Sequence, residues 1–493
     1  MRAPGKEILK NRARSNNTLY PSANGMRGVT MRRPIAVAVI LLMLAGSTAG
    51  AAADGGADAP PDEKAAGAGP RDEITPDGLY WCNIRRITFD KAPDGFPKLA
   101  VSANGTAGVG WERNGQFMWK KIDRLGNELS AERNITKGTF PLQGGGFAPA
   151  VIGVDSKGNY HICFSEAGAG VFYLKIDGNG NNLVPKKSVP MGATIPHNPS
   201  IAVARNDIVH IIYEDFRFGY DHEAISYARL LNDGTLDKDG VRMSREDQAV
   251  SGSTVCADLS NNVHAIYVDS SPLVFHAKLD NFGNPLPQAP PALLYTPGGA
   301  MEYVGPGAVC ADGTGAVHVV WNSNGSGVGR LMYMKLDNNG NKLAAGESGM
   351  GIPLTANATA MGYPSIAAGS SGTAYAVWSD NRDGAPNIWY TGIRASFEND
   401  TRLPERAIRL TNDTNGSALE PNIALDTDNH LHVVWKDAYE GNYELFTGSL
   451  TTAASRPTWP PKSSSRSATY GRTRLDRPTL LSGTPADSTI RSA

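Results

Sequence analysis

Short apolar segments recur along the middle of the chain at nearly constant spacing. Each begins with proline or a small residue and contains small and branched apolar side chains. The seven segments begin at Pro97, Pro149, Pro199, Ser253, Gly307, Pro364 and Pro421. Successive segments therefore start 50 to 57 residues apart. A fixed period of this length indicates that one supersecondary unit is repeated seven times.

Each repeat contains further segments with the length and composition of β-strands. About ten residues after the first segment, a second one ends in an aromatic residue, at Trp111, Phe164, Tyr213, Tyr267, Trp321, Trp378 and Trp435. Most repeats then have a third segment, such as 388–391, and several continue into a turn such as 337–341. Asn-Gly and Gly-Asn steps in these turns favour tight hairpins. A fourth segment, such as 407–411, completes the repeat.

Four short antiparallel strands in roughly 40 to 50 residues are typical of one propeller blade, which cannot bury both of its faces alone. The sequence therefore predicts an all-β fold, a seven-bladed β-propeller over residues 79–451. The last repeat stops after its third strand, near 445–450, whereas 84–90 resembles a fourth strand placed before the first repeat. We expect this N-terminal strand to complete the C-terminal blade, which would remove an open sheet edge.

The two ends of the chain differ in composition from the repeats. Arg32 and Arg33 precede an apolar run over 35–45 and then small residues, which predicts a leader and signal peptide in 1–53. The alternative is an uncleaved membrane anchor. Residues 54–78 are predicted to be a disordered linker, and 452–493 a disordered, basic tail rich in Ser, Thr and Pro. We expect a protein secreted to the periplasm or cell surface.

Charge and cysteine content exclude several classes of partner. The chain has 47 basic and 48 acidic side chains, so no overall field favours nucleic acid or an anionic membrane surface. Four widely separated cysteines match neither a zinc motif nor a dense disulfide framework. Cys256 and Cys310 occupy equivalent positions in neighbouring repeats and are expected to be buried free thiols. The predicted protein is a monomer without a cofactor.

Two sets of polar residues resemble metal ligands but fit structural roles better. Five histidines occupy one equivalent position in the repeats, at His161, His210, His264, His318 and His432. Equivalent positions are spread around a propeller axis and cannot converge on one metal ion, so we expect structural contacts between blades. Asp177 and Asp337 begin turns that resemble calcium loops, but the terminal glutamate of such loops is missing. We expect them to stabilise the turns, and no metal site is predicted.

A loop motif follows the second strand in two repeats, where residues 213–219 and 378–384 both read aromatic-x-Asp-x-Arg-x-Gly. The aspartate of such a loop can accept backbone N–H bonds while the arginine pairs with it, so a structural role is favoured. These residues, with the Ile-x-Tyr segment after the second copy, resemble the repeats of exported bacterial β-propeller proteins. They are more loosely similar to the Asp-box propellers of the sialidase-like superfamily. The chain has no Arg-Ile-Pro motif and no complete Ser-x-Asp-x-Gly-x-Thr-Trp box, so it departs from sialidases.

The predicted architecture also places a candidate site. Loops between strands two and three, and between strand four and the next strand one, emerge on the same face and surround one mouth of the axial channel. The candidate ligand-binding residues there are Glu112, Arg113, Phe147, His197, Asn198, Asp215, Arg217, Asp269, Tyr303, Tyr363, Asp380, Arg382, Glu420 and Asp437. Aromatic rings beside carboxylates and arginines suit sugars or peptide segments.

Two hypotheses about function follow from this face. The first is a non-catalytic module that binds a glycan or a protein through the channel mouth. The alternative is a sialidase-like glycoside hydrolase or lyase that uses paired carboxylates at the mouth, about 5 to 9.5 Å apart and with split acidities. No motif of a catalytic triad, phosphate loop or paired metal site is present, so the catalytic residues are not assigned from sequence.

Overall fold

The protein is described by a computed structural model. It describes residues 75, 78–138, 141–142, 148–189, 196–218, 222–246, 249–286, 291–296, 304–323, 329–346, 348–355, 362–394, 407–412, 417–439 and 441–452. The predicted signal peptide (1–53) lies outside the described residues, as do nearly all of the predicted linker (54–78) and tail (452–493). The described residues contain strands and turns but no helix, so none there could span a bilayer as a helix.

Seven antiparallel sheets form the blades, numbered here in chain order. Blade 1 contains β2 (Asp94–Val101), β3 (Ala107–Arg113), β4 (Gln116–Ile122) and β5 (Arg133–Asn134). Blade 2 contains β6 (Ala150–Val154), β7 (Tyr160–Glu166), β8 (Gly170–Ile176) and β9 (Asn182–Ser188). Blade 3 contains β10 (His197–Val203), β11 (Val209–Asp215), β12 (Ala224–Leu230) and β13 (Leu236–Arg242). Blade 4 contains β14 (Val250–Ala257), β15 (Val263–Asp269), β16 (Val274–Leu279) and β17 (Ala292–Tyr295).

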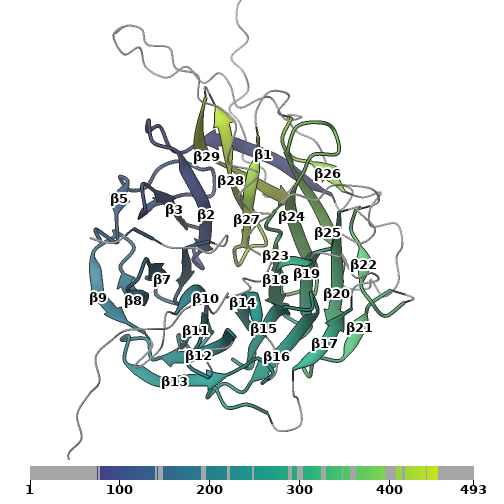
Figure 1. The fold of residues 1–493 in the computed structure, drawn as a ribbon. Coiled ribbons are helices and arrows are strands. Elements are labelled where there is room, and N and C mark those ends of the chain that lie inside the picture. The colour runs from purple at the N-terminus through teal and green to yellow at the C-terminus, as the bar shows by residue number, and fades with distance from the viewer. Residues whose placement is uncertain are drawn as a thin grey trace, which may run out of the picture. The chain divides into compact units, whose positions relative to one another are not determined.

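The remaining blades follow the same order. Blade 5 contains β18 (Val304–Ala311), β19 (Val317–Ser323), β20 (Arg330–Leu336), β21 (Lys342–Ala344) and β22 (Ile352–Pro353), the last two both paired with β20. Blade 6 contains β23 (Ser365–Ala368), β24 (Ala374–Asp380), β25 (Asn387–Ile393) and β26 (Ile408–Arg409). Blade 7 contains β27 (Leu419–Leu425), β28 (Leu431–Tyr439), β29 (Asn442–Thr452) and β1 (Leu79–Arg86). The predicted seven-bladed β-propeller is confirmed, and Figure 1 shows its blades arranged around an axis.

The N-terminal strand belongs to the last sheet. β1 pairs antiparallel with β29, with Leu79 opposite Thr452 and Arg86 opposite Phe446. β2 of blade 1 lies against β27 and β28 of blade 7. The outermost strand of blade 7 therefore comes from the start of the described chain, and its other three strands come from the end.

The hydrophobic core lies between blades rather than within them. Each of the seven apolar clusters draws buried side chains mainly from two neighbouring blades. The aromatic residues that end the second strands are central to these clusters, and Trp111, Trp321 and Trp378 are fully buried. β7, β11 and β15 are buried at every position, because both faces of each strand pack against other blades. This burial explains the nearly continuous apolar runs in the sequence.

The first strand of five blades contains a β-bulge near the predicted mouth. At the bulges, Phe96, Asn198 and Glu420 have positive φ angles of 51°, 48° and 54°. Such angles are uncommon for residues other than glycine, and each of these three residues directly precedes a proline. Bulges of this kind re-aim side chains and are frequent next to active sites.

The equivalent histidines are structural, but their contacts differ from the prediction. His161 and His318 bond through Nδ1 to the hydroxyls of Tyr173 and Tyr333, each at 2.8 Å and each on the third strand of the same blade. The expectation of contacts between blades was wrong, because the ring lies along its own sheet beside the next strand. Asp177 accepts the backbone N–H groups of the two residues at i+2 and i+4, so its predicted turn role is confirmed. All four cysteines are free.

Candidate functional site at the channel mouth

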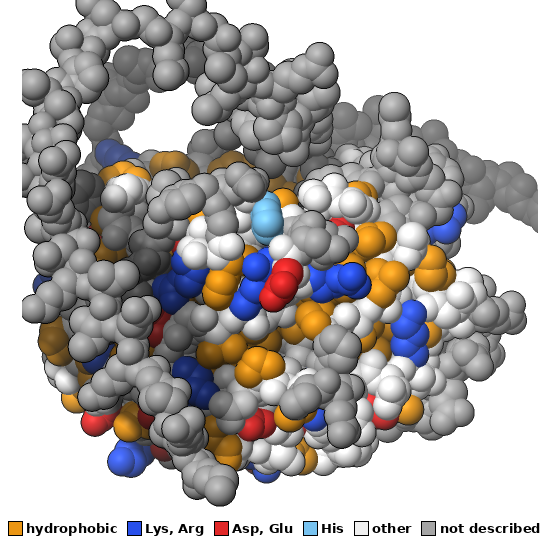
Figure 2. All heavy atoms as spheres, turned by 60° about the horizontal axis from the view of Figure 1, so that its bottom comes forward, with side chains coloured by type: hydrophobic (Ala, Val, Ile, Leu, Met, Phe, Trp, Pro, Cys, Tyr) orange, Lys and Arg blue, Asp and Glu red, His pale blue; other side chains and the backbone are white. Residues whose placement is uncertain are grey.

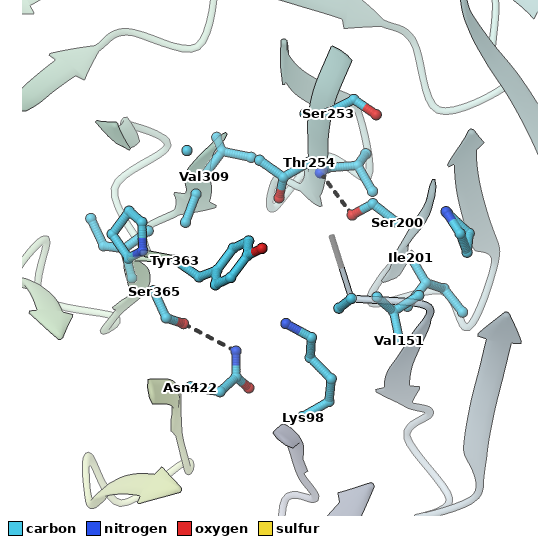
Figure 3. Close-up of a pocket in the computed structure, with 18 of the residues that line it drawn as sticks. Lys98, Val151, Ser200, Ile201, Ser253, Thr254, Val309, Tyr363, Ser365 and Asn422 are labelled. Atoms are coloured by element: carbon cyan, nitrogen blue, oxygen red, sulfur yellow. Dashed lines mark hydrogen bonds between the residues drawn. The ribbon is translucent and has the colours of Figure 1, made fainter. Parts of the chain in front are cut away.

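The axial channel contains a cavity of about 260 Å³. Its wall is formed by the first strands of all seven blades, β2, β6, β10, β14, β18, β23 and β27. Figure 3 shows side chains from opposite sides of the ring, including Lys98, Ser200 and Tyr363, pointing toward the space between them. The bulged segments at Asn198 and Gly252 also line this cavity, so the mouth and the channel are continuous.

A cluster of three titratable groups lies at this mouth in blade 3. His197 begins β10, Glu214 lies opposite it near the end of β11, and Glu223 directly precedes β12. His197 Nε2 is 3.6 Å from a carboxylate oxygen of Glu214 and 3.2 Å from one of Glu223. We call these three residues the mouth cluster. It brings two carboxyl groups to one imidazole nitrogen.

The local backbone explains how Glu214 is held. Its side chain is 1% exposed and accepts hydrogen bonds from Asn198 Nδ2 at 2.8 Å and from the backbone N–H of Gly252 at 2.9 Å. Both donors belong to bulges with positive φ angles, 48° at Asn198 and 63° at Gly252. The bulges of blades 3 and 4 therefore fix the position of this carboxyl group.

Electrostatics give Glu214 an unusual acidity. Burial raises its pKa to about 7, and the nearby Glu223 carboxylate acts in the same direction. His197 and the two hydrogen bonds from Asn198 and Gly252 oppose this shift without cancelling it. A carboxyl group with a pKa near neutrality can donate a proton at pH 7 and take it back. The mouth cluster therefore has the parts of an acid–base pair.

The same three residues are also the described groups at the mouth that could hold a metal ion. Their ligand atoms lie within 4.8 Å of one another. Both Glu214 oxygens, however, already accept hydrogen bonds, which suits proton transfer better than ligation. A second group of metal-ligating type, Asp426, Asp428 and His430, lies on the opposite face, where the Arg124 guanidinium pairs with both aspartates.

A second group of polar and aromatic residues lies at the mouth in blades 6, 7 and 1. Glu420 accepts hydrogen bonds from the Lys436 ammonium group and from the backbone N–H of Phe96, each at 2.6 Å. The Phe96 ring meets the Tyr363 ring edge-on with 6.3 Å between centroids, and Lys436 Nζ lies 5.8 Å from the Phe96 centroid. Two aromatic rings at the rim of a cavity form a surface on which a sugar can stack.

The Asp-x-Arg residues of the predicted site are engaged within their loops. Asp215 and Asp380 are fully buried. Asp215 accepts Arg217 Nε at 2.7 Å, and Asp380 accepts Arg382 Nε at 2.9 Å together with the backbone N–H of the same arginine. These contacts hold the loop after the second strand. Binding of a ligand by these four residues stays a prediction.

The other predicted site residues are more scattered. Arg113 pairs with the buried carboxylate of Asp94 at 2.6 Å, and Glu112 accepts the backbone N–H of Gly115. Asp269 accepts two backbone N–H groups of its own loop. Asp437 accepts the indole N–H of Trp435 at 3.4 Å. The structure therefore brings His197 and Asn198 together beside Glu214, and Tyr363 and Glu420 together beside Phe96. It leaves Glu112, Arg113, Asp269 and Asp437 apart from both groups.

Some residues fall outside either the description or the prediction. Phe147 and Tyr303 lie outside the described residues. Sequence reasoning singled out neither Glu214 nor Glu223 nor Lys98. The motif pointed to Asp215, but its neighbour Glu214 points the other way across β11 and reaches Gly252 of blade 4. Successive side chains of a strand point to opposite faces, and this alternation is the signal in the sequence that separates Glu214 from Asp215.

Comparisons with known proteins support the fold alone. No family model matches the chain, and no curated protein matches it. An ulvan lyase of polysaccharide lyase family PL25 is 11% identical with a TM-score of 0.51, covering 74% of this chain and 95% of that one. Polysaccharide lyase Uly1 is 10% identical with a TM-score of 0.47, covering 74% and 91%. The Penicillium chrysogenum α-L-arabinanase is 9% identical with a TM-score of 0.41, covering 75% and 98%.

The similarity to the ulvan lyase, at 11% identity, concerns the fold alone. Figure 2 shows acidic, basic and apolar side chains mixed over the side of the molecule that it presents. No broad basic area is visible among the described residues there.

Proposed function

We propose that this protein is an enzyme that cleaves glycosidic bonds at the channel mouth, with Glu214 as the general acid. One observation carries the proposal. A buried carboxyl group with a pKa near 7 lies at the edge of a cavity, beside an imidazole and a second carboxylate. A structural carboxylate would be expected to have an ordinary or lowered pKa, whereas enzymes that protonate a leaving group raise it.

The contacts suggest a division of roles. The protonated Glu214 would donate its proton to the glycosidic oxygen as the bond from that oxygen to carbon breaks. The resulting carboxylate would be stabilised by the hydrogen bonds from Asn198 and Gly252. His197 would accept the second proton. In a hydrolysis the proton comes from the water whose oxygen bonds to the anomeric carbon, and in an elimination it comes from the sugar carbon that forms a carbon–carbon double bond as the neighbouring C–O bond breaks. Glu223, 28% exposed, would stabilise the imidazolium that forms.

Two further observations agree with a polysaccharide substrate. The rim offers aromatic rings at Phe96 and Tyr363 on the opposite side of the mouth, where a sugar chain could stack. The structural neighbour with the TM-score of 0.51 is a polysaccharide lyase by its description. A module that only binds glycan needs hydrogen bonds and stacking, but it has no need of a carboxyl group with a shifted pKa.

An assay on a panel of polysaccharides tests this proposal. Purified protein is incubated with neutral and acidic polysaccharides, and both new reducing ends and unsaturated products are measured. We expect turnover of at least one polymer by the wild type, loss of turnover in Glu214→Gln, and retention in Glu112→Gln. Glu112 is the matched control because it occupies the equivalent strand position in blade 1. Unsaturated ends would assign elimination, and saturated reducing ends hydrolysis.

We also propose that the protein acts outside the cytoplasm. The support is the predicted signal peptide in 1–53 together with a polymeric substrate, which an enzyme meets outside the cell. N-terminal sequencing of the protein recovered from the culture medium or periplasm tests this. A mature form beginning near Asp54 is expected, and an uncleaved form retained in the membrane fraction would contradict it.

A further inference from the structure

One charged side chain in the axial channel has no partner that accounts for it. Lys98 lies on β2, the first strand of blade 1, and its amine points into the cavity (Figure 3). It is the only cation among the described residues that line the cavity, and it makes no hydrogen bond or ion pair with a described residue. Lys98 is half-buried, and an ammonium group shielded from water normally has a hydrogen-bonded counter-charge.

The surrounding wall does not supply that counter-charge. The Asn422 amide accepts the backbone N–H of Leu99 at 2.9 Å and donates to Ser365 Oγ at 3.2 Å. Ser200 Oγ accepts a backbone N–H from blade 4. These polar groups join neighbouring first strands to one another, as the dashed lines in Figure 3 indicate. They build the wall and leave the amine facing open space.

Two carboxyl groups could balance the charge of Lys98, but both are bonded to other groups. Glu420 interacts with Lys98 electrostatically, but its oxygens bond Lys436 and the backbone N–H of Phe96. Glu214 is the only carboxyl group lining the cavity among the described residues, and two hydrogen bonds hold it at the blade 3 side. Burial lowers the pKa of Lys98, and an added negative charge in the cavity would reverse that shift.

We propose that the axial channel is a binding site for one carboxylate group, carried by a sugar seated at the mouth, and that Lys98 is the residue that binds it. The inference rests on the proposed function for the presence of the sugar. It extends that function by naming the substrate class, an acidic glycan. It also assigns the channel a role that the mouth cluster does not have.

The size of the cavity agrees with this assignment. Its volume of about 260 Å³ lies below the roughly 300 to 1,000 Å³ of pockets that enclose whole drug-sized ligands. A single sugar substituent would enter it, while the rest of a chain would stay at the rim beside Phe96 and Tyr363. Hydroxyl groups and apolar residues form most of the wall, and an ammonium group attracts an anion more strongly in such surroundings than in bulk water.

Binding of small ligands that cannot be cleaved tests the inference independently of turnover. Isothermal titration calorimetry compares D-glucuronate and D-galacturonate with their neutral counterparts D-glucose and D-galactose, and with acetate and inorganic sulfate. The full chain is used as wild type, Lys98→Met and Lys98→Arg. Lys157→Met is the matched control, because Lys157 is an exposed lysine in a turn on the opposite face.

We expect at least one uronate to bind the wild type at least tenfold more tightly than its neutral counterpart and than acetate. Lys98→Met should weaken this binding by at least about tenfold, since a charge-assisted contact is lost. Lys98→Arg should retain part of it, and Lys157→Met should bind as the wild type does. Intact thermal unfolding midpoints in all variants would show that the channel still forms.

Three results would overturn the inference. Binding of uronates that is unchanged in Lys98→Met would remove Lys98 from the site. Equal binding of acetate or sulfate and of the uronates would assign the channel to free small anions instead of a sugar. Absence of any uronate binding would remove the acidic glycan. The proposed function fails separately, because Lys98-dependent binding without turnover of any polymer would keep the channel site and reject the enzyme.

Discussion

The two ends of the channel carry different pairings of histidine with carboxylate. On the face opposite the mouth, His318 Nε2 lies 2.9 Å from Asp312, and its Nδ1 bonds a tyrosine hydroxyl. The arrangement recurs in blades 2 and 4 at Asp155 with His161 and Asp258 with His264, although in blade 4 a histidine replaces the tyrosine. The mouth cluster occurs in one blade alone among the described residues, and it opens on the cavity.

Acidity separates the two regions further. Burial alone would raise the pKa of Asp312, but hydrogen bonds from His318 and from the loop outweigh it and hold this pKa below its ordinary range. At Glu214 burial prevails, and the pKa rises to about 7. The pair of histidine and aspartate that stabilises the fold is therefore repeated in several blades. The mouth cluster, in which Glu214 has a pKa shifted toward neutrality and is suited to proton transfer, occurs once among the described residues.

The largest effect is expected when the mouth cluster loses its acid. Glu214→Gln should reduce turnover of the cleaved polysaccharide by about 10²- to 10⁴-fold, the usual contribution of a general acid. Glutamine can still accept the Gly252 N–H bond, so near pH 4.5, where the Glu214 carboxyl group is protonated in the folded protein, the thermal unfolding midpoint should change little. Initial rates and differential scanning calorimetry measure the two quantities. A Glu112→Gln control with the same loss of rate would contradict a special role for Glu214.

A matched change on the opposite face should act on stability instead. Asp312→Ala removes the partner of His318 and the acceptor of two loop N–H groups, on Thr314 and Ala316. We expect the free energy of unfolding to fall by about 3 kcal/mol, since buried hydrogen-bonded groups are left without a partner. Urea titration measures it. Turnover per folded molecule should stay within about twofold of the wild type. A large loss of turnover would contradict the assignment of stability to one face and catalysis to the other.

The two regions should also respond to pH in opposite directions. The pKa of Glu214 is about 7 in the folded protein, whereas that of an unfolded glutamate is about 4.5. The free energy of unfolding of the wild type, relative to that of Glu214→Gln, should therefore fall by up to about 3 kcal/mol as pH rises from 4.5 to 7. The lowered pKa of Asp312 gives stability that is present above pH 4 and lost as pH falls. Urea titrations from about pH 2 to pH 8 compare the wild type with each variant. Parallel curves for Glu214→Gln and wild type would refute the raised pKa.

The smallest expected effect comes from completing the repeated pair in blade 3. His210 Nδ1 bonds the Tyr227 hydroxyl at 2.8 Å, but its buried Nε2 has no partner among the described residues, because position 204 holds alanine where blades 2, 4, 5 and 7 have aspartate. Ala204→Asp should raise the free energy of unfolding by about 1 kcal/mol at pH 7. Destabilisation in urea titrations would show that the pair does not transfer between blades.

The repeat made the fold predictable from sequence. Seven copies of one strand pattern reinforce each other, so irregular copies such as the one opening at Ser253 could still be aligned. The fourth-strand pattern at 84–90 suggested that a strand before the first copy joins the last blade, but β1, which pairs with β29, overlaps that pattern only at 84–86. Turn residues such as Asp177 were also assigned correctly, because their hydrogen bonds are local.

The candidate site was only partly predictable, because its residues differ from those at the equivalent positions of the other repeats. His197, Asn198, Tyr363 and Glu420 were found by position at the mouth. The shifted pKa of Glu214 depends on burial and on Gly252 of the next blade, which the sequence pattern does not encode. The isolation of Lys98 likewise becomes visible only when seven first strands are brought around one axis.

Infrared difference spectroscopy of the carboxyl groups tests the central claim most directly, without knowledge of the substrate. The carbonyl absorption of a protonated side chain is followed from pH 4 to 9 in the wild type and in Glu214→Gln, and the two titrations are subtracted. The account predicts one protonated carboxyl group, present only in the wild type, that ionises with a midpoint near pH 7. A difference signal that ionises near pH 4.5 would contradict it.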